Sequence, residues 1–201
     1  MGTMESVTGI SREQAVLSYG LLAGGKSRRM GCDKAALRIG EETFLEHLAA
    51  EFQDKGPFMV AVRDEKQGRE IGLPYIKDVN QEVGPMEGIR NLLAWSPTEY
   101  IFIGACDTPH LRAEMAFYLA AAIPPGYDCC AFAAKGRIHP LGAVYSRQLK
   151  EPAAQMIRDG NYRVMSLLEQ SKTKVVDIRE AGFPARWLEN INTRESYAGM
   201  D

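Results

Sequence analysis

Residues 15–37 read AVLSYGLLAGGKSRRMGCDKAAL and join an apolar run to a loop rich in glycine and cations. The first nine residues, AVLSYGLLA, are typical of a short buried strand. Gly24 and Gly25 follow at once, and a glycine pair lets the backbone turn sharply and approach a ligand closely. The segment therefore predicts a strand whose carboxyl end carries a binding loop.

Apolar runs and helical patterns alternate along the rest of the chain. Strands are predicted at 15–23, 58–62, 74–76, 100–105, 129–133, 141–145, 175–178 and 187–191, and helices at 42–52, 86–95, 111–123, 148–157 and 164–170. Continuous apolar strands alternating with helices favour an α/β fold, with a mostly parallel sheet covered on both faces. In such sheets, ligands bind beyond the carboxyl ends of the strands.

Size and charge narrow the class of protein. The chain has 201 residues, which suits one domain, expected over residues 15–201 behind a disordered leader at residues 1–14. Its net charge is -2, from 24 basic and 26 acidic residues, which does not favour nucleic acid as a partner. The sequence predicts no membrane span and no signal peptide. The four cysteines fit neither a zinc site nor a disulfide framework, and free thiols are typical of a cytoplasmic protein.

The loop after the first strand carries a dense group of cations. Lys26, Arg28, Arg29 and Lys34 lie within nine residues, and Asp33 is the opposing charge. Backbone N–H groups in a glycine turn form an anion site, and the cations neutralise a triphosphate. The segment therefore predicts a nucleoside triphosphate site, with a solvated basic turn as the alternative.

The same segment also satisfies a second pattern. Residues 20–27 read GLLAGGKS and match the P-loop pattern G-x-x-x-x-G-K-[ST]. In a P-loop, however, the four intervening residues belong to the loop, whereas Leu21, Leu22 and Ala23 continue the strand. Because Gly31 also interrupts the segment that would have to start the helix, the P-loop remains the second interpretation.

Two carboxylates follow predicted strands. Asp107 comes directly after YIFIGAC, where an Mg²⁺ ion bound to a nucleotide would find a carboxylate ligand. The alternative for Asp107 is the N-cap of the next helix. Asp78 follows the short strand at 74–76, and its alternative is an Asx turn.

These residues resemble the molybdenum cofactor guanylyltransferase (MobA) family. LAGGKSRRMGCDK resembles the family signature L-A-G-G-x-S-x-R-M-G-x-D-K. Five further blocks follow in the family's order over about residues 15–197: DVNQEVGPMEGI (78–89), FIGACDTPHL (102–111), HPLGAVYS (139–146), NYRVMSLL (161–168) and ENINTRE (189–195). The later blocks favour the guanylyltransferase branch over the sugar-nucleotide enzymes.

The resemblance implies a single Rossmann-like nucleotidyltransferase domain. It implies GTP as donor, Mg²⁺ as cofactor, and molybdopterin or molybdenum-molybdopterin as acceptor, with pyrophosphate and the guanine dinucleotide cofactor as products. It further implies contacts with proteins of the same pathway or with the enzymes that receive the cofactor. The resemblance implies that Leu22, Ala23, Gly24 and Asp78 bind the nucleotide, that Lys34 binds its phosphates and that Asp107 binds Mg²⁺. From the composition of the loop we add Gly25 for the nucleotide and Arg29 for the phosphates.

Four polar residues in the later blocks are candidates for the acceptor pocket: His139, Arg163, Asn190 and Asn192. For His139 alone, a structural role is the alternative. The chain departs from the family where asparagines often end the second strand, because Ala61 and Arg63 stand there instead. A cytidylyltransferase, a sugar-nucleotide enzyme, a P-loop NTPase and a non-catalytic nucleotide-binding protein remain alternative functions.

Overall fold

The computed structural model describes residues 17–23, 38–80 and 82–191. Within these ranges, seven strands form one sheet in the order β5-β4-β1-β6-β8-β7-β9. Four neighbouring pairs in it are parallel, and β8 runs antiparallel to both β6 and β7. The mostly parallel sheet is therefore confirmed. The strands are β1 (Leu17–Leu22), β4 (Phe58–Val62), β5 (Tyr75–Lys77), β6 (Tyr100–Ala105), β7 (Cys129–Ala134), β8 (Arg137–Ser146) and β9 (Thr173–Asp177).

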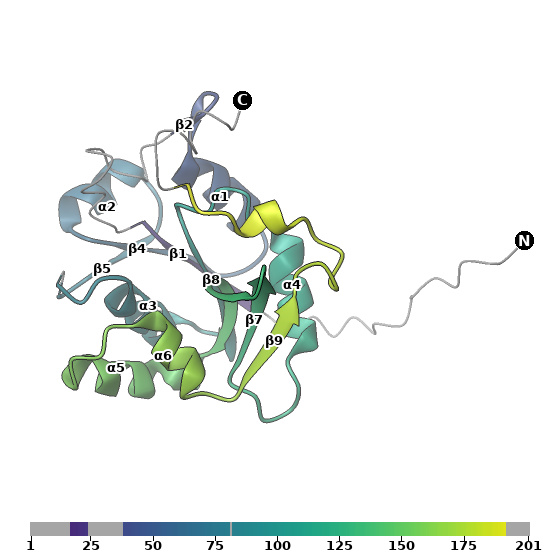
Figure 1. Ribbon diagram of the computed structural model, residues 1–201. Coiled ribbons are helices and arrows are strands. Elements are labelled where there is room, and N and C mark those ends of the chain that lie inside the picture. Colours follow the sequence, from purple (N-terminus) through teal and green to yellow (C-terminus); the bar gives the residue numbers. More distant parts are fainter. Residues whose placement is uncertain (1–16, 24–37, 81, 192–201) are drawn as a thin grey trace, which may run out of the picture.

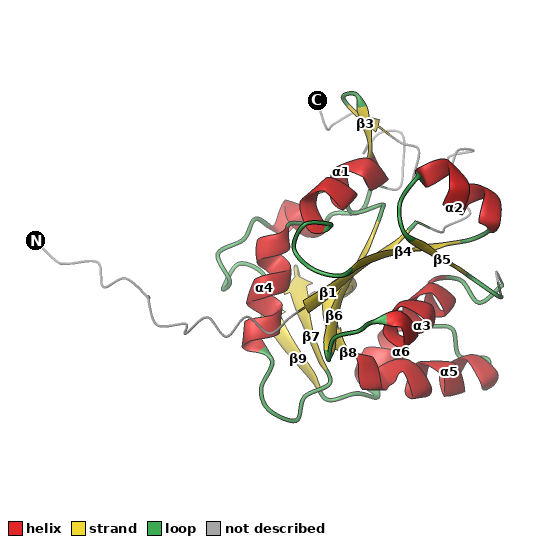
Figure 2. Cartoon of the chain, turned by 180° about the vertical axis from the view of Figure 1, so that it is seen from behind, coloured by secondary structure: helices red, strands yellow, loops and turns green. Residues whose placement is uncertain are grey.

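Helices cover both faces of the sheet, as Figures 1 and 2 show from opposite sides. One face carries α1 (Phe44–Phe52), α2 (Glu65–Ile71) and α4 (Ala113–Ala122), and the other carries α3 (Pro85–Trp95), α5 (Lys150–Arg158) and α6 (Val164–Glu169). Two short strands, β2 (Arg38–Ile39) and β3 (Glu42–Thr43), pair with each other before α1. The predicted three-layer α/β/α fold is confirmed.

The central strand explains why the sequence begins with a continuous apolar run. Every residue of β1 is buried, because β4 and β6 flank it and helices cover both faces. Tyr19 and Leu21 pack toward α1 and α4, whereas Leu22 packs toward α3. Gly20 is small because α3 lies against it: a Cβ there would come within 2.8 Å of a methyl carbon of Leu92. The absence of a side chain at Gly20 therefore allows α3 to pack closely against β1.

Several elements differ from the sequence prediction, among them the short strands β2 and β3, which were not predicted; β3 lies where the predicted helix at 42–52 begins. Helix α2 was not predicted. Strand β8 begins at Arg137 rather than Leu141, and its pairing is irregular around Pro140, where a missing N–H is tolerated. The predicted strand at 187–191 is wrong, because Pro184 precedes a 3₁₀ helix, η3 (Ala185–Leu188). The chain then joins the sheet edge through one hydrogen bond, from Ile191 N to Asp107 O at 2.7 Å.

Candidate functional site

The candidate site is the edge of the sheet where β5, β4, β1 and β6 end. These strands are parallel, so their carboxyl ends lie at the same edge. Asp78 follows β5 and Asp107 follows β6, with β4 and β1 between them. Neighbouring strands are about 4.8 Å apart, so three spacings place the ends of β5 and β6 roughly 14 Å apart. A nucleoside with its phosphates can lie across such an interval.

The end of β1 is held by both neighbouring strands. Ala23 N donates to Ala61 O at 3.0 Å, and Cys106 N donates to Leu22 O at 3.1 Å. Leu22 and Ala23 are both buried. The point from which the glycine loop leaves the sheet is therefore fixed. That Leu22 and Ala23 themselves hold a nucleotide stays a prediction.

Gln67 on α2 links the ends of β1 and β4, a role that the sequence pattern does not predict. Its side chain is 5% exposed. The amide nitrogen donates to Ala23 O at 3.1 Å, and the amide oxygen accepts from Arg63 N at 2.9 Å. Asp64 accepts from Gln67 N at 2.9 Å and so caps α2. Gln67 thus joins the backbone at the ends of β1 and β4 from a helix that follows β4.

Asp107 lies two residues beyond β6, half-buried, and it is not the N-cap of α4, which is Arg112. The Thr108 hydroxyl lies within hydrogen-bond distance of two acceptors, Asp107 Oδ1 at 3.4 Å and Asn190 Oδ1 at 3.1 Å, which share its single hydrogen. The backbone bond from Ile191 to Asp107 brings the segment around Asn190 to this strand end. Oxygen atoms from three side chains therefore gather at the end of β6. Asn190, predicted for the acceptor, lies beside the predicted metal ligand.

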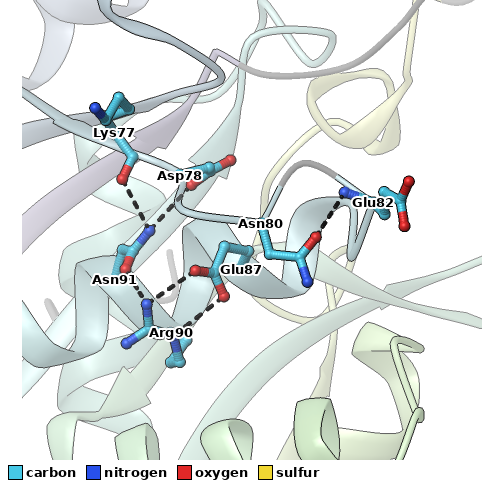
Figure 3. Close-up of polar contacts among 7 residues, drawn as sticks. All are labelled: Lys77, Asp78, Asn80, Glu82, Glu87, Arg90 and Asn91. Carbon is cyan, nitrogen blue, oxygen red and sulfur yellow. Dashed lines mark hydrogen bonds and ion pairs between the residues drawn. The ribbon is translucent and has the colours of Figure 1, made fainter.

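Asp78 lies at the start of a network of polar side chains (Figure 3). Asn91 Nδ2 donates to Asp78 Oδ1 at 3.1 Å, and Asp78 N donates to Val62 O at 2.8 Å. Burial raises the pKa of Asp78 to about 6, and the hydrogen bond from Asn91 opposes that shift. Apart from the glycines of the block at 78–89, no sequence pattern predicts this network.

The structure argues against the P-loop interpretation. The first glycine of that pattern, Gly20, and the two residues after it lie within β1. A P-loop requires these residues in a loop around phosphates, whereas here they pair with β4 and β6. The absence of a side chain at Gly20 is explained by packing against Leu92.

His139 lies near the start of β8, which runs antiparallel to β6. In the register that sets Ala143 opposite Ile103, β6 ends at Ala105, so residues 137–140 extend past its end, toward the edge that carries Asp107. Burial, together with the Arg137 charge, lowers the pKa of His139, so the imidazole is neutral at pH 7. Arg163 is exposed at the N-cap of α6, a different element, which packs against α5 and β8.

Several predicted site residues lie outside the described residues: Gly24, Gly25, Arg29, Lys34 and Asn192. Their roles stay predictions from the sequence. The described residues hold no group of three His, Cys, Asp or Glu side chains arranged for a metal ion. Among those same residues, no helix has the length and apolar character needed to cross a bilayer.

The sequence matches a known family model over residues 20–175, described as the MobA-like NTP transferase domain. The chain belongs to this family. The match begins inside β1 and extends to β9, so it spans the glycine loop and both carboxylates. The chain is accordingly a nucleotidyltransferase of the MobA type.

Curated relatives of this MobA-like transferase match it over nearly their whole length. A probable molybdenum cofactor guanylyltransferase of Carboxydothermus hydrogenoformans is 29% identical, over 90% of this chain and 93% of that relative. A protein of the same description from Bacillus cytotoxicus is 28% identical, over 98% of this chain and 97% of its own length.

Two solved structures share the fold. Molybdopterin-guanine dinucleotide biosynthesis protein A from Archaeoglobus fulgidus superposes with a TM-score of 0.79 at 21% identity, over 90% of this chain and 95% of that one. The 4-diphosphocytidyl-2C-methyl-D-erythritol synthase from Anaerococcus prevotii gives 0.71 at 13% identity, over 91% and 93%. At these identities, the likeness concerns the fold alone.

Replacing Gln67 by Leu is expected to destabilise this MobA-like transferase and weaken nucleotide binding. The change leaves Ala23 O and Arg63 N buried without their side-chain partner, which costs about 2 kcal/mol of unfolding free energy. Urea unfolding and nucleotide titration measure the two effects. Lys66→Ala, an exposed neighbour on α2, is the control. Equal unfolding free energies for the two variants would contradict this role of Gln67.

Replacing Asp78 by Asn is expected to stabilise the nucleotide-free protein at pH 7. The folded-state pKa, about 6, lies above that of an unfolded Asp, so ionisation destabilises the fold as pH rises through this window. After a discount for solvent screening, the gain is roughly 1–2 kcal/mol. Urea unfolding from pH 4 to pH 8 should show the advantage of the variant growing up to about pH 6.5 and then levelling. A gain that is constant with pH would rule out this explanation.

Proposed function

We propose that this chain transfers GMP from GTP to the phosphate of molybdopterin or molybdenum-molybdopterin, releasing pyrophosphate. The observation that carries the proposal is the position of Asp107, with Thr108 and Asn190, one strand away from the start of the glycine loop. The curated relatives named as probable molybdenum cofactor guanylyltransferases support the choice of donor and acceptor.

The residues at the end of β6 fit a hard divalent cation. Mg²⁺ prefers oxygen ligands and usually takes one or two carboxylates together with phosphate oxygens. Asp107 supplies a carboxylate, and oxygen atoms of Thr108 and Asn190 lie beside it. Bound there, Mg²⁺ would neutralise phosphate charge during transfer. Asp107 would hold it, while Lys34 and Arg29 would bind the triphosphate.

The reaction needs no nucleophile from the protein. A phosphate oxygen of the acceptor attacks the α-phosphorus of GTP, the new P–O bond forms, and the bond to the β-phosphate oxygen breaks, so pyrophosphate leaves. The chain has to position two anions and stabilise the developing charge. Asp78 would hold the guanosine end, at the far side of β1 from Asp107.

The acceptor would lie on the β8 side of Asp107. Asn190 and His139 both belong to segments that reach this side of the strand end, and the neutral imidazole can accept or donate one hydrogen bond there. We include Arg163 and Asn192 in this pocket on the basis of the sequence blocks. Transfer of the product to an acceptor enzyme or pathway protein would follow.

The experiment is to incubate the protein with GTP, CTP or ATP, with Mg²⁺ and with or without molybdopterin, and to measure pyrophosphate and orthophosphate. Pyrophosphate released from GTP only when molybdopterin is present is the expected result. Turnover of CTP instead would indicate a cytidylyltransferase. Orthophosphate without acceptor would indicate an NTPase, and tight GTP binding without turnover would indicate a non-catalytic nucleotide-binding protein.

A further inference from the structure

Three polar side chains of α3 form a continuous network that ends at Asp78 (Figure 3). Glu87, only 4% exposed, accepts two hydrogen bonds from Arg90, from Nε at 3.2 Å and from Nη2 at 2.9 Å. Arg90 Nη2 also donates to Asn91 Oδ1. The buried carboxylate therefore fixes the guanidinium, and the guanidinium fixes the amide.

The chemistry of these groups gives the network a direction. A guanidinium can only donate and a carboxylate can only accept, so the amide oxygen of Asn91 faces Arg90 and its nitrogen faces Asp78. That nitrogen donates to Asp78 Oδ1 at 3.1 Å and lies 3.5 Å from Lys77 O. Asn91 is 5% exposed, so solvent hardly competes for these bonds. The result is one defined orientation for the Asp78 carboxylate.

Gly88 lets the helix bring this network close to the strand ends. A Cβ at Gly88 would come within 2.8 Å of Leu22 Cδ2 and 3.2 Å of Ala61 Cβ, and 3.6 Å of Asp78 Oδ1. The helix therefore lies directly against the end of β1 and against Asp78. The hydrogen bond from Asn91 reaches Oδ1 of the Asp78 carboxylate, at the end of β5 and beside the end of β1.

We propose that Asn91, held by Glu87 and Arg90, is a positioning residue that presents the Asp78 carboxylate to hydrogen-bond donors of the bound nucleoside. This inference rests on the proposed function for the identity of the ligand. A half-buried carboxylate and a buried ion pair add little to stability by themselves, because desolvation offsets their attraction. Recognition of a ligand by the Asp78 carboxylate would explain why Glu87, Arg90 and Asn91 are arranged to hold it. The donors of guanosine are the ring N1–H, the 2-amino group and the ribose hydroxyls.

The pH dependence of nucleotide binding distinguishes a positioning role of Asn91 from a purely structural one, because it depends on the pKa of Asp78. Burial raises its pKa, Glu87 adds to the rise, and the Asn91 bond and the Arg90 charge oppose it. The neighbouring Lys77 ammonium lies 4.0 Å from Glu65 of α2. Removing the Asn91 donor should therefore raise the pKa of Asp78 further. The acid limb of nucleotide binding should move to higher pH.

The test compares the wild type with Asn91→Leu and with the isosteric Asn91→Asp, which keeps an acceptor for Arg90 but replaces the donor to Asp78 by an acceptor. Gln155→Leu, an exposed amide on α5, is the matched control. We expect both Asn91 variants to raise the Kd and KM for GTP about 10- to 100-fold at pH 7, with kcat changed less than about 3-fold. We also expect the acid limb of binding to move upward in pH.

Two nucleotide analogues identify the donors. ITP lacks the 2-amino group, and 2′-deoxy-GTP lacks one ribose hydroxyl. If the missing group is the one that donates to Asp78, the Asn91 substitution has nothing left to disturb. That analogue should then bind equally well to the wild type and to Asn91→Asp. If both variants match Gln155→Leu in Kd, KM and pH profile while wild type turns over GTP, the inference is wrong and the proposed function stands. If wild type binds GTP without turnover, the Kd profile still decides between the two outcomes.

Discussion

Asp107→Asn is expected to reduce nucleotidyl transfer about 10³-fold while leaving the fold intact. The change removes the negative charge at the end of β6 but keeps the size of the side chain. The Thr108 hydroxyl can still donate to the remaining amide oxygen, and the backbone bond from Ile191 does not involve the side chain. The loss should therefore fall on kcat, with a melting temperature close to that of the wild type.

The control for this variant is Asp159→Asn, which makes the same change at the exposed C-cap of α5. Pyrophosphate release at saturating GTP and Mg²⁺ measures the rate, and thermal unfolding measures the fold. Raising the Mg²⁺ concentration should recover part of the activity of Asp107→Asn, because the remaining oxygen ligands are neutral but present. If Asp107→Asn keeps more than a tenth of wild-type kcat, Asp107 is not the metal ligand.

Lys34→Ala is expected to lower kcat/KM at least 100-fold, and Lys26→Ala considerably less. In the transferase interpretation, Lys34, the last residue of the family signature, contacts the phosphates. A P-loop depends instead on the lysine that follows its last glycine, which is Lys26 here. Each substitution removes one positive charge, and in the transferase interpretation only the Lys34 charge stabilises the transition state.

Steady-state kinetics on the two lysine variants under identical conditions makes this comparison direct. Both lysines lie outside the described residues, so the prediction depends on the sequence pattern together with the position of Gly20 inside β1. Wild-type activity in Lys34→Ala would remove the basis for the phosphate site. A larger loss in Lys26→Ala than in Lys34→Ala would favour the P-loop interpretation despite the strand assignment.

The fold could be predicted from the sequence where apolar runs are long and uninterrupted. The prediction for β4 and β6 matches the structure at both ends, because each run is bounded by polar or turn residues. Helix α2 was missed since EKQGREI has few apolar residues. Its signal was a different one: Asp64 is followed three residues later by Gln67, the pattern of a capped helix start, and Gly72 ends the helix with a positive φ.

The site could be predicted only in part, for a physical reason. Residues that follow parallel strands share an edge whatever the details, so Asp78 and Asp107 could be placed there from the strand pattern. Side chains that reach across the fold leave no such periodic signal. Gln67 bonds to a backbone group 44 residues away, at Ala23, and Thr108 bonds to Asn190 across 82 residues. Such contacts depend on tertiary packing that a single sequence does not display.

The error at 187–191 has a related cause. WLENI is a short, partly apolar segment, and a segment of that length cannot be assigned from its apolar residues alone. Here Pro184 begins a turn, and the segment meets the sheet edge at Asp107 through one backbone bond. The consequence for the site is useful, because that bond brings Asn190 to the predicted metal ligand.

The most direct test is a crystal structure of the protein with GTP and Mg²⁺. We expect the triphosphate against residues 24–34, the metal ion at Asp107, and the guanosine end beside Asp78, so that the nucleotide lies across the end of β1. A nucleotide bound elsewhere on the molecule, away from both carboxylates, would contradict the account.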